Sequence, residues 1–123
     1  MNYNPVGWFE ISVTDMARAR AFYEKLLGVT LEVSEWPGGS MAVFPHTDVK
    51  GAGGCLVQGD GYVPSATGTL VYFTAPDLDG ALAKVEGLGG KIVRPKTDIG
   101  EHGIMAFVSD TEGNRIALHT RKK

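Results

Sequence analysis

The sequence repeats its punctuation residues at one offset, and this repeat constrains the fold more than any other feature. Asp15 aligns with Asp77, which sets the offset at 77 − 15 = 62 residues. The same offset aligns Gly28 with Gly90 and the tetrapeptide DVKG at 48–51 with DTEG at 110–113. Because the chain has 123 residues, these matches predict two copies of one folding unit.

Each unit begins with a strand pattern followed by a helix pattern. In the first unit, apolar residues recur at helical spacing behind Asp15, a residue type that caps helices, and Gly28 follows as a helix stop. The second unit repeats this pattern behind Asp77. The predicted apolar helix faces are Met16, Ala19, Phe22, Tyr23 and Leu26, and Leu78, Ala81, Leu82, Val85 and Leu88.

Three short strands follow each helix. We expect them at 30–34, 41–45 and 52–58 in the first unit and at 91–94, 102–108 and 114–120 in the second. The fold class is therefore α+β, with two tandem βαβββ modules forming a curled mixed sheet and helices on its outer face. We expect one domain over 1–123, with module 1 at about 5–60 and module 2 at about 67–121.

Alternation along the strands separates a core face from a second face. The helix-facing core is expected to contain Phe9, Ile11, Val13, Val71, Phe73, Ile116 and Leu118. The second face carries Trp8, Glu10, Ser12, Gly53, Cys55, Val57, Leu70, Tyr72, Thr74, Arg115, Ala117 and His119. Aromatic and charged residues are mixed on this face, so we expect it to line a cavity.

Three segments, VTDMARARAFYEKLLG, APDLDGALAKVEGLGGKIV and DTEGNRIALH, resemble the vicinal oxygen chelate superfamily. This group contains glyoxalase I, extradiol dioxygenases and bleomycin resistance proteins. The resemblance implies paired βαβββ modules and, in many members, a metal that binds two adjacent substrate oxygens. Its ligand positions fall here on Trp8, Cys55, Leu70 and Ala117. Three of these residues cannot bind a metal and one thiol is insufficient, so we expect no metal site and no cofactor.

Residues two positions further along the same strands share the face of the implied ligand positions, and three of them carry groups capable of acid–base chemistry. We predict Glu10, Tyr72 and His119 as catalytic candidates. Ligand-binding candidates are Trp8, Cys55, Leu70, Arg115 and Ala117, together with His102 in the predicted loop 95–103 and Trp36 at the opposite lip.

Structural roles remain open for most of these residues. Glu10 could be a carboxylate paired with Arg115 or His119, and Tyr72 could be a packed ring with a satisfied hydroxyl. Trp8 could fill the space of the missing metal, and Cys55 could be a small buried hydrophobe.

Charge and composition limit the classes of binding partner and the cell compartment that we expect for this chain. A net charge of −2 without charge runs favours neither nucleic acid nor a membrane surface. One cysteine and the absence of a signal-peptide pattern favour the cytoplasm. The resemblance implies a homodimer and a small-molecule ligand.

Three functions remain open at this stage. The preferred one is a metal-free protein that binds a small organic molecule, with proton-transfer chemistry of the lyase or isomerase type by Glu10 and His119. The second is a non-catalytic, resistance-type drug-binding protein. The third is a metal-dependent lyase or dioxygenase with shifted ligands, in which Glu10 and His119 would hold a divalent metal.

Overall fold

The computed structural model describes residues 4–46 and 51–122 and contains two four-stranded mixed sheets. The first module comprises β1 (Trp8–Ser12), α1 (Met16–Leu27), β2 (Glu32–Trp36), β3 (Gly39–Val43) and β4 (Gly53–Gly59). The second comprises β5 (Tyr72–Thr74), α2 (Leu78–Val85), the 3-10 turn η1 (Glu86–Leu88), β6 (Lys91–Asp98), the 3-10 turn η2 (Gly100–His102), β7 (Ile104–Ser109) and β8 (Arg115–Thr120). The strand orders are β1-β4-β3-β2 and β5-β8-β7-β6. The predicted α+β class and tandem βαβββ modules are confirmed.

Strand pairing reproduces the 62-residue repeat. Glu10 lies opposite Cys55 in the parallel pair β1 and β4, and Tyr72 lies opposite Ala117 in the parallel pair β5 and β8. The two pairs are related by 72 − 10 = 62 and 117 − 55 = 62. The predicted repeat therefore extends to strand register.

The helix ends follow the predicted caps with one difference. Asp15 accepts a hydrogen bond from the Arg18 amide at 3.1 Å, and Asp77 accepts one from the Gly80 amide at 3.0 Å. Gly28 ends α1 with φ of 68°. In the second module the left-handed residue is Gly89, one position before the predicted Gly90, because α2 tightens into η1 before it stops. The predicted counterpart of Asp110, Asp48, lies outside the described residues.

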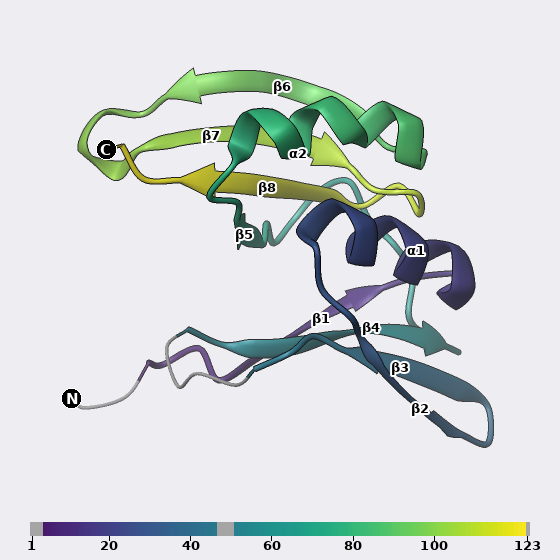
Figure 1. The fold of residues 1–123 in the computed structure, drawn as a ribbon. Helices are drawn as coiled ribbons and strands as arrows, with labels where there is room; N and C mark the ends of the chain where they lie inside the picture. The colour runs from purple at the N-terminus through teal and green to yellow at the C-terminus, as the bar shows by residue number, and fades with distance from the viewer. Residues whose placement is uncertain (1–3, 47–50, 123) are drawn as a thin grey trace.

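Both helices pack into one core that the two modules share. Figure 1 shows the sheets as two layers with α1 between them. The buried cluster joins side chains from both helices and both sheets, including Phe22, Tyr23, Leu56, Val85 and Leu118. The predicted core face is confirmed, since Ile11, Val13, Ile116 and Leu118 are buried and Phe9, Val71 and Phe73 pack against them. The other face of each sheet therefore turns away from this core.

The DTEGN turn at 110–114 joins the second module to the first. Glu112 accepts hydrogen bonds from the Thr14 and Asp15 amides at 2.8 and 2.9 Å and from Arg18 Nε at 2.7 Å. Its side chain is fully buried. These contacts cap the start of α1 with a residue about 100 positions away in sequence.

Two neighbours of Glu112 extend the junction. The hydroxyl of Tyr23 donates to the buried Asp110 at 2.6 Å. The Asn114 amide donates to the Ser12 carbonyl at 2.8 Å, and its oxygen accepts from the Ser65 amide at 2.9 Å. The turn thus holds α1, β1 and the segment between the modules in one arrangement.

No helix within residues 4–46 and 51–122 combines the length and the apolar character that a membrane span requires.

Candidate functional site

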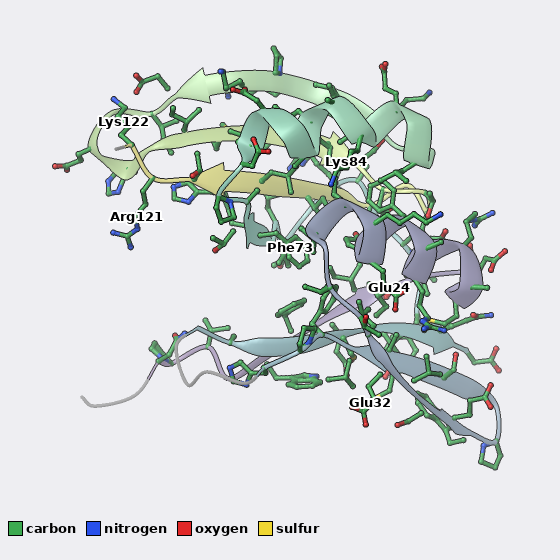
Figure 2. The ribbon with its side chains drawn as sticks, viewed as in Figure 1. Glu24, Glu32, Phe73, Lys84, Arg121 and Lys122 are labelled. Atoms are coloured by element: carbon green, nitrogen blue, oxygen red, sulfur yellow. The ribbon has the colours of Figure 1, made fainter. Side chains whose placement is uncertain are left out.

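The helix-free face of the first sheet, named face A here, is aromatic and acidic. Strand register places on it Trp8, Glu10, Ser12, Glu32, Ser34, Trp36, Met41, Val43, Cys55 and Val57. One row crosses all four strands as Glu32, Val43, Cys55 and Glu10. Figure 2 shows Glu32 on the side of the lower sheet away from α1, whereas Phe73 lies between the two layers.

The helix-free face of the second sheet, named face B here, is aromatic and basic. Register places on it Tyr72, Thr74, Lys91, Arg94, Thr97, Met105, Phe107, Ser109, Arg115, Ala117 and His119. Its corresponding row reads Arg94, Phe107, Ala117 and Tyr72. The repeat therefore places Arg94 where face A has Glu32, and Tyr72 where face A has Glu10.

The residues at the four implied ligand positions do not fit a metal ion. Trp8 offers an indole, Leu70 and Ala117 offer hydrocarbon, and Cys55 offers one buried thiol. Within the described residues, no three His, Cys, Asp or Glu side chains are grouped closely enough to hold a metal. We therefore derive no step through a metal at these positions.

The Cys55 thiol is fully buried beneath face A. Burial raises the pKa of the thiol to about 11, the charge of Glu10 adds to this effect, and the Trp8 side chain opposes it. A neutral thiol is a weak nucleophile and a weak ligand. Cys55 therefore has the physical properties of a small buried hydrophobe.

The three predicted catalytic residues divide between the two faces. Glu10 lies on face A, where it lines a depression of about 210 Å³ together with Arg115. Tyr72 and His119 lie on face B with ring centroids 6.4 Å apart. The depression lined by Glu10 does not include His119, and the one lined by His119 does not include Glu10. A single chain therefore brings Glu10 to Arg115 but does not bring it to His119.

His119 is held by the backbone of η2. Its Nε2 donates to the carbonyl of His102, and this contact fixes the tautomer with the proton on Nε2 when the ring is neutral. The side chain of His102 itself is 80% exposed. The predicted loop 95–103 is shorter than expected, because β6 continues to Asp98 before η2 begins.

The remaining predicted ligand-binding residues occupy the ends of the two faces. Trp8 is 48% exposed at one end of face A, and Trp36 is 40% exposed at the other with its ring against Gly39. Leu70 is half-buried just before β5, and Ala117 is fully buried beneath face B.

Four residues that lie on or beside these faces were not identified from the sequence. Glu32, Arg94 and Phe107 share the two central rows, and His46 lies beside Trp8 over Gly53. The repeat could have identified Arg94 as the counterpart of Glu32, since 94 − 32 = 62. Phe107 had no such signal, because β6 and β7 pair with register shifts near Arg94.

The sequence profile described as "Glyoxalase/Bleomycin resistance protein/Dioxygenase superfamily" matches residues 6–118. The chain belongs to this superfamily. The resemblance inferred from the repeat and the DTEGN turn is thereby confirmed at the level of the family. The superfamily includes both enzymes and binding proteins, so membership does not decide the activity.

Curated relatives are about twice the length of this chain. It is 30% identical over 116 residues to a Mycobacterium tuberculosis protein named "Putative glyoxylase CFP32", matching 91% of this chain and 44% of the relative. It is 28% identical over 124 residues to "Anthracycline biosynthesis protein DnrV" of Streptomyces peucetius, matching 91% and 45%. The chain thus spans less than half of these relatives.

Solved structures of similar length share the fold. An antibiotic binding protein, TnmS3 from Streptomyces sp. CB03234, is 25% identical with a TM-score of 0.65, and the match covers 99% of both chains. A glyoxalase family protein from Bacillus cereus is 19% identical with a TM-score of 0.74, and the match covers 100% of this chain and 99% of that one.

Proposed function

We propose that this protein binds a small organic molecule between face A of one copy and face B of a second copy, without a metal at the family's ligand positions. The observation that carries the proposal is that both faces carry exposed aromatic rings, Trp8 and Trp36 on face A and Tyr72 on face B. Trp8, Trp36 and Tyr72 are 48%, 40% and 51% exposed, although large apolar side chains are normally covered. Such rings provide flat stacking surfaces for an organic ligand.

A second copy is needed because both helices fill the space between the two sheets of one chain. The two faces turn away from the shared core and, within one chain, meet at the depression that Glu10 and Arg115 line. A cavity that also includes Tyr72 and His119 therefore calls for another chain. Charge supports this pairing. By strand register, face A carries Glu10 and Glu32 without a lysine or arginine, and face B carries Lys91, Arg94 and Arg115 without a carboxylate. Attraction between opposite charges favours an interface between face A and face B. Repulsion between like charges disfavours an interface between two copies of the same face.

The similar length and fold of the antibiotic binding protein TnmS3 support a binding role for a chain of this size. We propose that the cavity uses stacking and polar contacts rather than a metal, a proposal supported by the absence of ligand atoms on Trp8, Leu70 and Ala117.

Proton transfer is the second candidate function. In the paired arrangement, Glu10 of one copy shares a cavity with His119 of the other. With Nε2 of His119 donating to the His102 carbonyl, Nδ1 is the nitrogen left to exchange a proton. Turnover of a bound ligand distinguishes the two functions, because a binding protein releases its ligand unchanged. If a ligand is turned over, Glu10→Gln and His119→Ala should abolish that turnover at unchanged affinity, which would assign the proton transfer to these two residues.

Tryptophan fluorescence tests the binding proposal directly, because both tryptophans of the chain lie on face A. A panel of neutral, anionic and cationic bicyclic aromatics is titrated into the protein. We expect at least one compound to quench the emission and Tyr72→Ala, on face B, to weaken that binding at least tenfold. Tyr62→Ala is the matched control, since Tyr62 is 38% exposed and lies beyond the end of β4, outside the strands that form the two faces. Equal effects of the two substitutions, or stoichiometric metal in the purified protein bound through Glu10 and His119, would contradict the proposal.

A further inference from the structure

The charges of the two faces do not cancel. Face A contributes two carboxylates, Glu10 and Glu32, and face B contributes three permanent cations, Lys91, Arg94 and Arg115. Pairing face A with face B therefore leaves one excess positive charge per cavity, since 3 − 2 = 1. An uncompensated cation in a partly desolvated cavity is unfavourable, and an anionic ligand would compensate it.

The excess charge lies beside an aromatic surface. The Arg115 guanidinium carbon is 5.5 Å from the centre of the Phe107 ring, and that of Arg94 is 6.0 Å from it. Tyr72 meets the same ring edge to face at a centroid distance of 6.3 Å. Guanidinium groups beside an aromatic ring retain in-plane N–H donors, which suit the oxygens of a carboxylate or sulfonate.

These donors lack protein partners within residues 4–46 and 51–122. Neither Arg94 nor Arg115 forms an ion pair with any described carboxylate. Arg115 Nε is buried and has no hydrogen-bond partner among the described residues. A buried donor without an acceptor is costly, so the Arg115 guanidinium is incompletely satisfied by the described residues.

We propose that the cavity takes a planar aromatic anion, a carboxylate or a sulfonate, as its ligand class. The anionic group binds Arg94 and Arg115, and the ring stacks against Tyr72 and Phe107 on one side and Trp8 of the other copy on the opposite side. This inference rests on the proposed binding function and specifies the charge and shape of its ligand.

Three probes of the same shape and different charge test the ligand class. We would titrate 2-naphthoate, 2-naphthamide and 2-naphthylmethylammonium by calorimetry at pH 7 and low salt, with tryptophan emission recorded in parallel. We expect 2-naphthoate to bind at least tenfold more tightly than 2-naphthamide, and the ammonium compound to bind most weakly. The preference should shrink as salt rises.

Arginine variants assign the preference to face B. Arg115→Gln and Arg94→Gln should each reduce 2-naphthoate affinity at least fivefold and reduce 2-naphthamide affinity less. Lys84→Gln is the matched control, since it removes one positive charge from α2 and not from face B. Sedimentation of each variant confirms that the dimer persists at the concentrations used.

The outcomes separate this inference from the function on which it rests. If 2-naphthamide or the ammonium compound binds as tightly as 2-naphthoate and quenches the tryptophans, the ligand class is wrong and the binding function stands. If none of the three probes binds to the dimer, both proposals fail. If Lys84→Gln matches Arg115→Gln in its effect, the preference comes from net charge alone, which overturns the proposed arginine site.

Discussion

Replacing Glu112 with glutamine should weaken the junction between the two modules. Burial of Glu112 opposes its ionisation, but hydrogen bonds from Arg18, Thr14 and Asp15 outweigh burial and lower its pKa from 4.5 to about 2. At about 1.4 kcal/mol per pKa unit, this difference corresponds to roughly 3 kcal/mol of stability at neutral pH. Because Arg18 is half-exposed and partly screened by solvent, we expect Glu112→Gln to cost about 2 kcal/mol.

The pH dependence has a defined sign. A carboxylate whose pKa is lower in the folded state stabilises the fold above its unfolded pKa and loses that contribution as the pH falls through the folded pKa. The difference between wild type and Glu112→Gln should therefore be full above about pH 4.5 and shrink towards pH 2. At lower pH the protonated wild-type side chain is uncharged, as glutamine is.

Urea unfolding followed by circular dichroism measures this difference. Curves recorded at pH 7 and at pH 2.5 give the free energy of unfolding for each protein. Glu101→Gln is the matched control, since its side chain is 91% exposed, and it should change stability by less than about 0.5 kcal/mol. The reasoning is refuted if Glu112→Gln unfolds like the control at pH 7, or if its deficit is the same at both pH values.

Three further predictions follow from single contacts. Native Cys55, buried and with a pKa of about 11, should react with a disulfide reagent at pH 8 on the order of 100-fold more slowly than in urea, and equal rates would show that the thiol is accessible. Gly103→Ala should cost at least about 1 kcal/mol more than Gly100→Ala in thermal or urea unfolding. Both glycines have positive φ, but only at Gly103 would the new Cβ lie 2.3 Å from the Thr120 carbonyl oxygen, and equal costs would contradict this. Tyr23→Phe should lower the free energy of unfolding by about 2 kcal/mol, because it removes one charge-assisted hydrogen bond of 2.6 Å from the buried Asp110, which keeps its bonds from Asn114 and the Glu112 amide. An unchanged free energy would show that the Tyr23 bond is dispensable.

Local patterns were sufficient to predict the modules and their faces. Asp15 and Asp77 cap helices through contacts within three residues, and strand alternation separates Ile11 from Glu10 without knowledge of the rest of the chain. The 62-residue repeat then placed Cys55 and Ala117 in corresponding strands. The caps and the strand alternation depend on short-range geometry, which a local sequence pattern reflects directly.

The arrangement of the two modules depends on contacts that local patterns do not express. The hydrogen bonds of Glu112 to Thr14 and Arg18 join residues more than 90 positions apart, and they set how the modules pack. Because Glu10 and His119 were predicted on the same cavity-lining face, a pocket uniting them was expected. The packing of both helices into one core separates these residues in a single chain.

A charge-swap experiment tests the central claim most directly, namely that face A of one copy pairs with face B of another. One variant carries Glu10→Arg and Glu32→Arg on face A, and a second carries Arg94→Glu and Arg115→Glu on face B. In a dimer of either variant alone, like charges would face each other across both interfaces. Each variant should therefore sediment as a monomer of about 13.1 kDa.

Mixing the two variants restores opposite charges at one interface and leaves the other with its wild-type residues. We predict that the equimolar mixture forms a heterodimer in native mass spectrometry, with one copy of each variant, and that it recovers ligand-dependent tryptophan quenching. Persistence of dimers in either variant alone, or failure of the mixture to associate while the wild type is a dimer, would contradict the pairing of face A with face B.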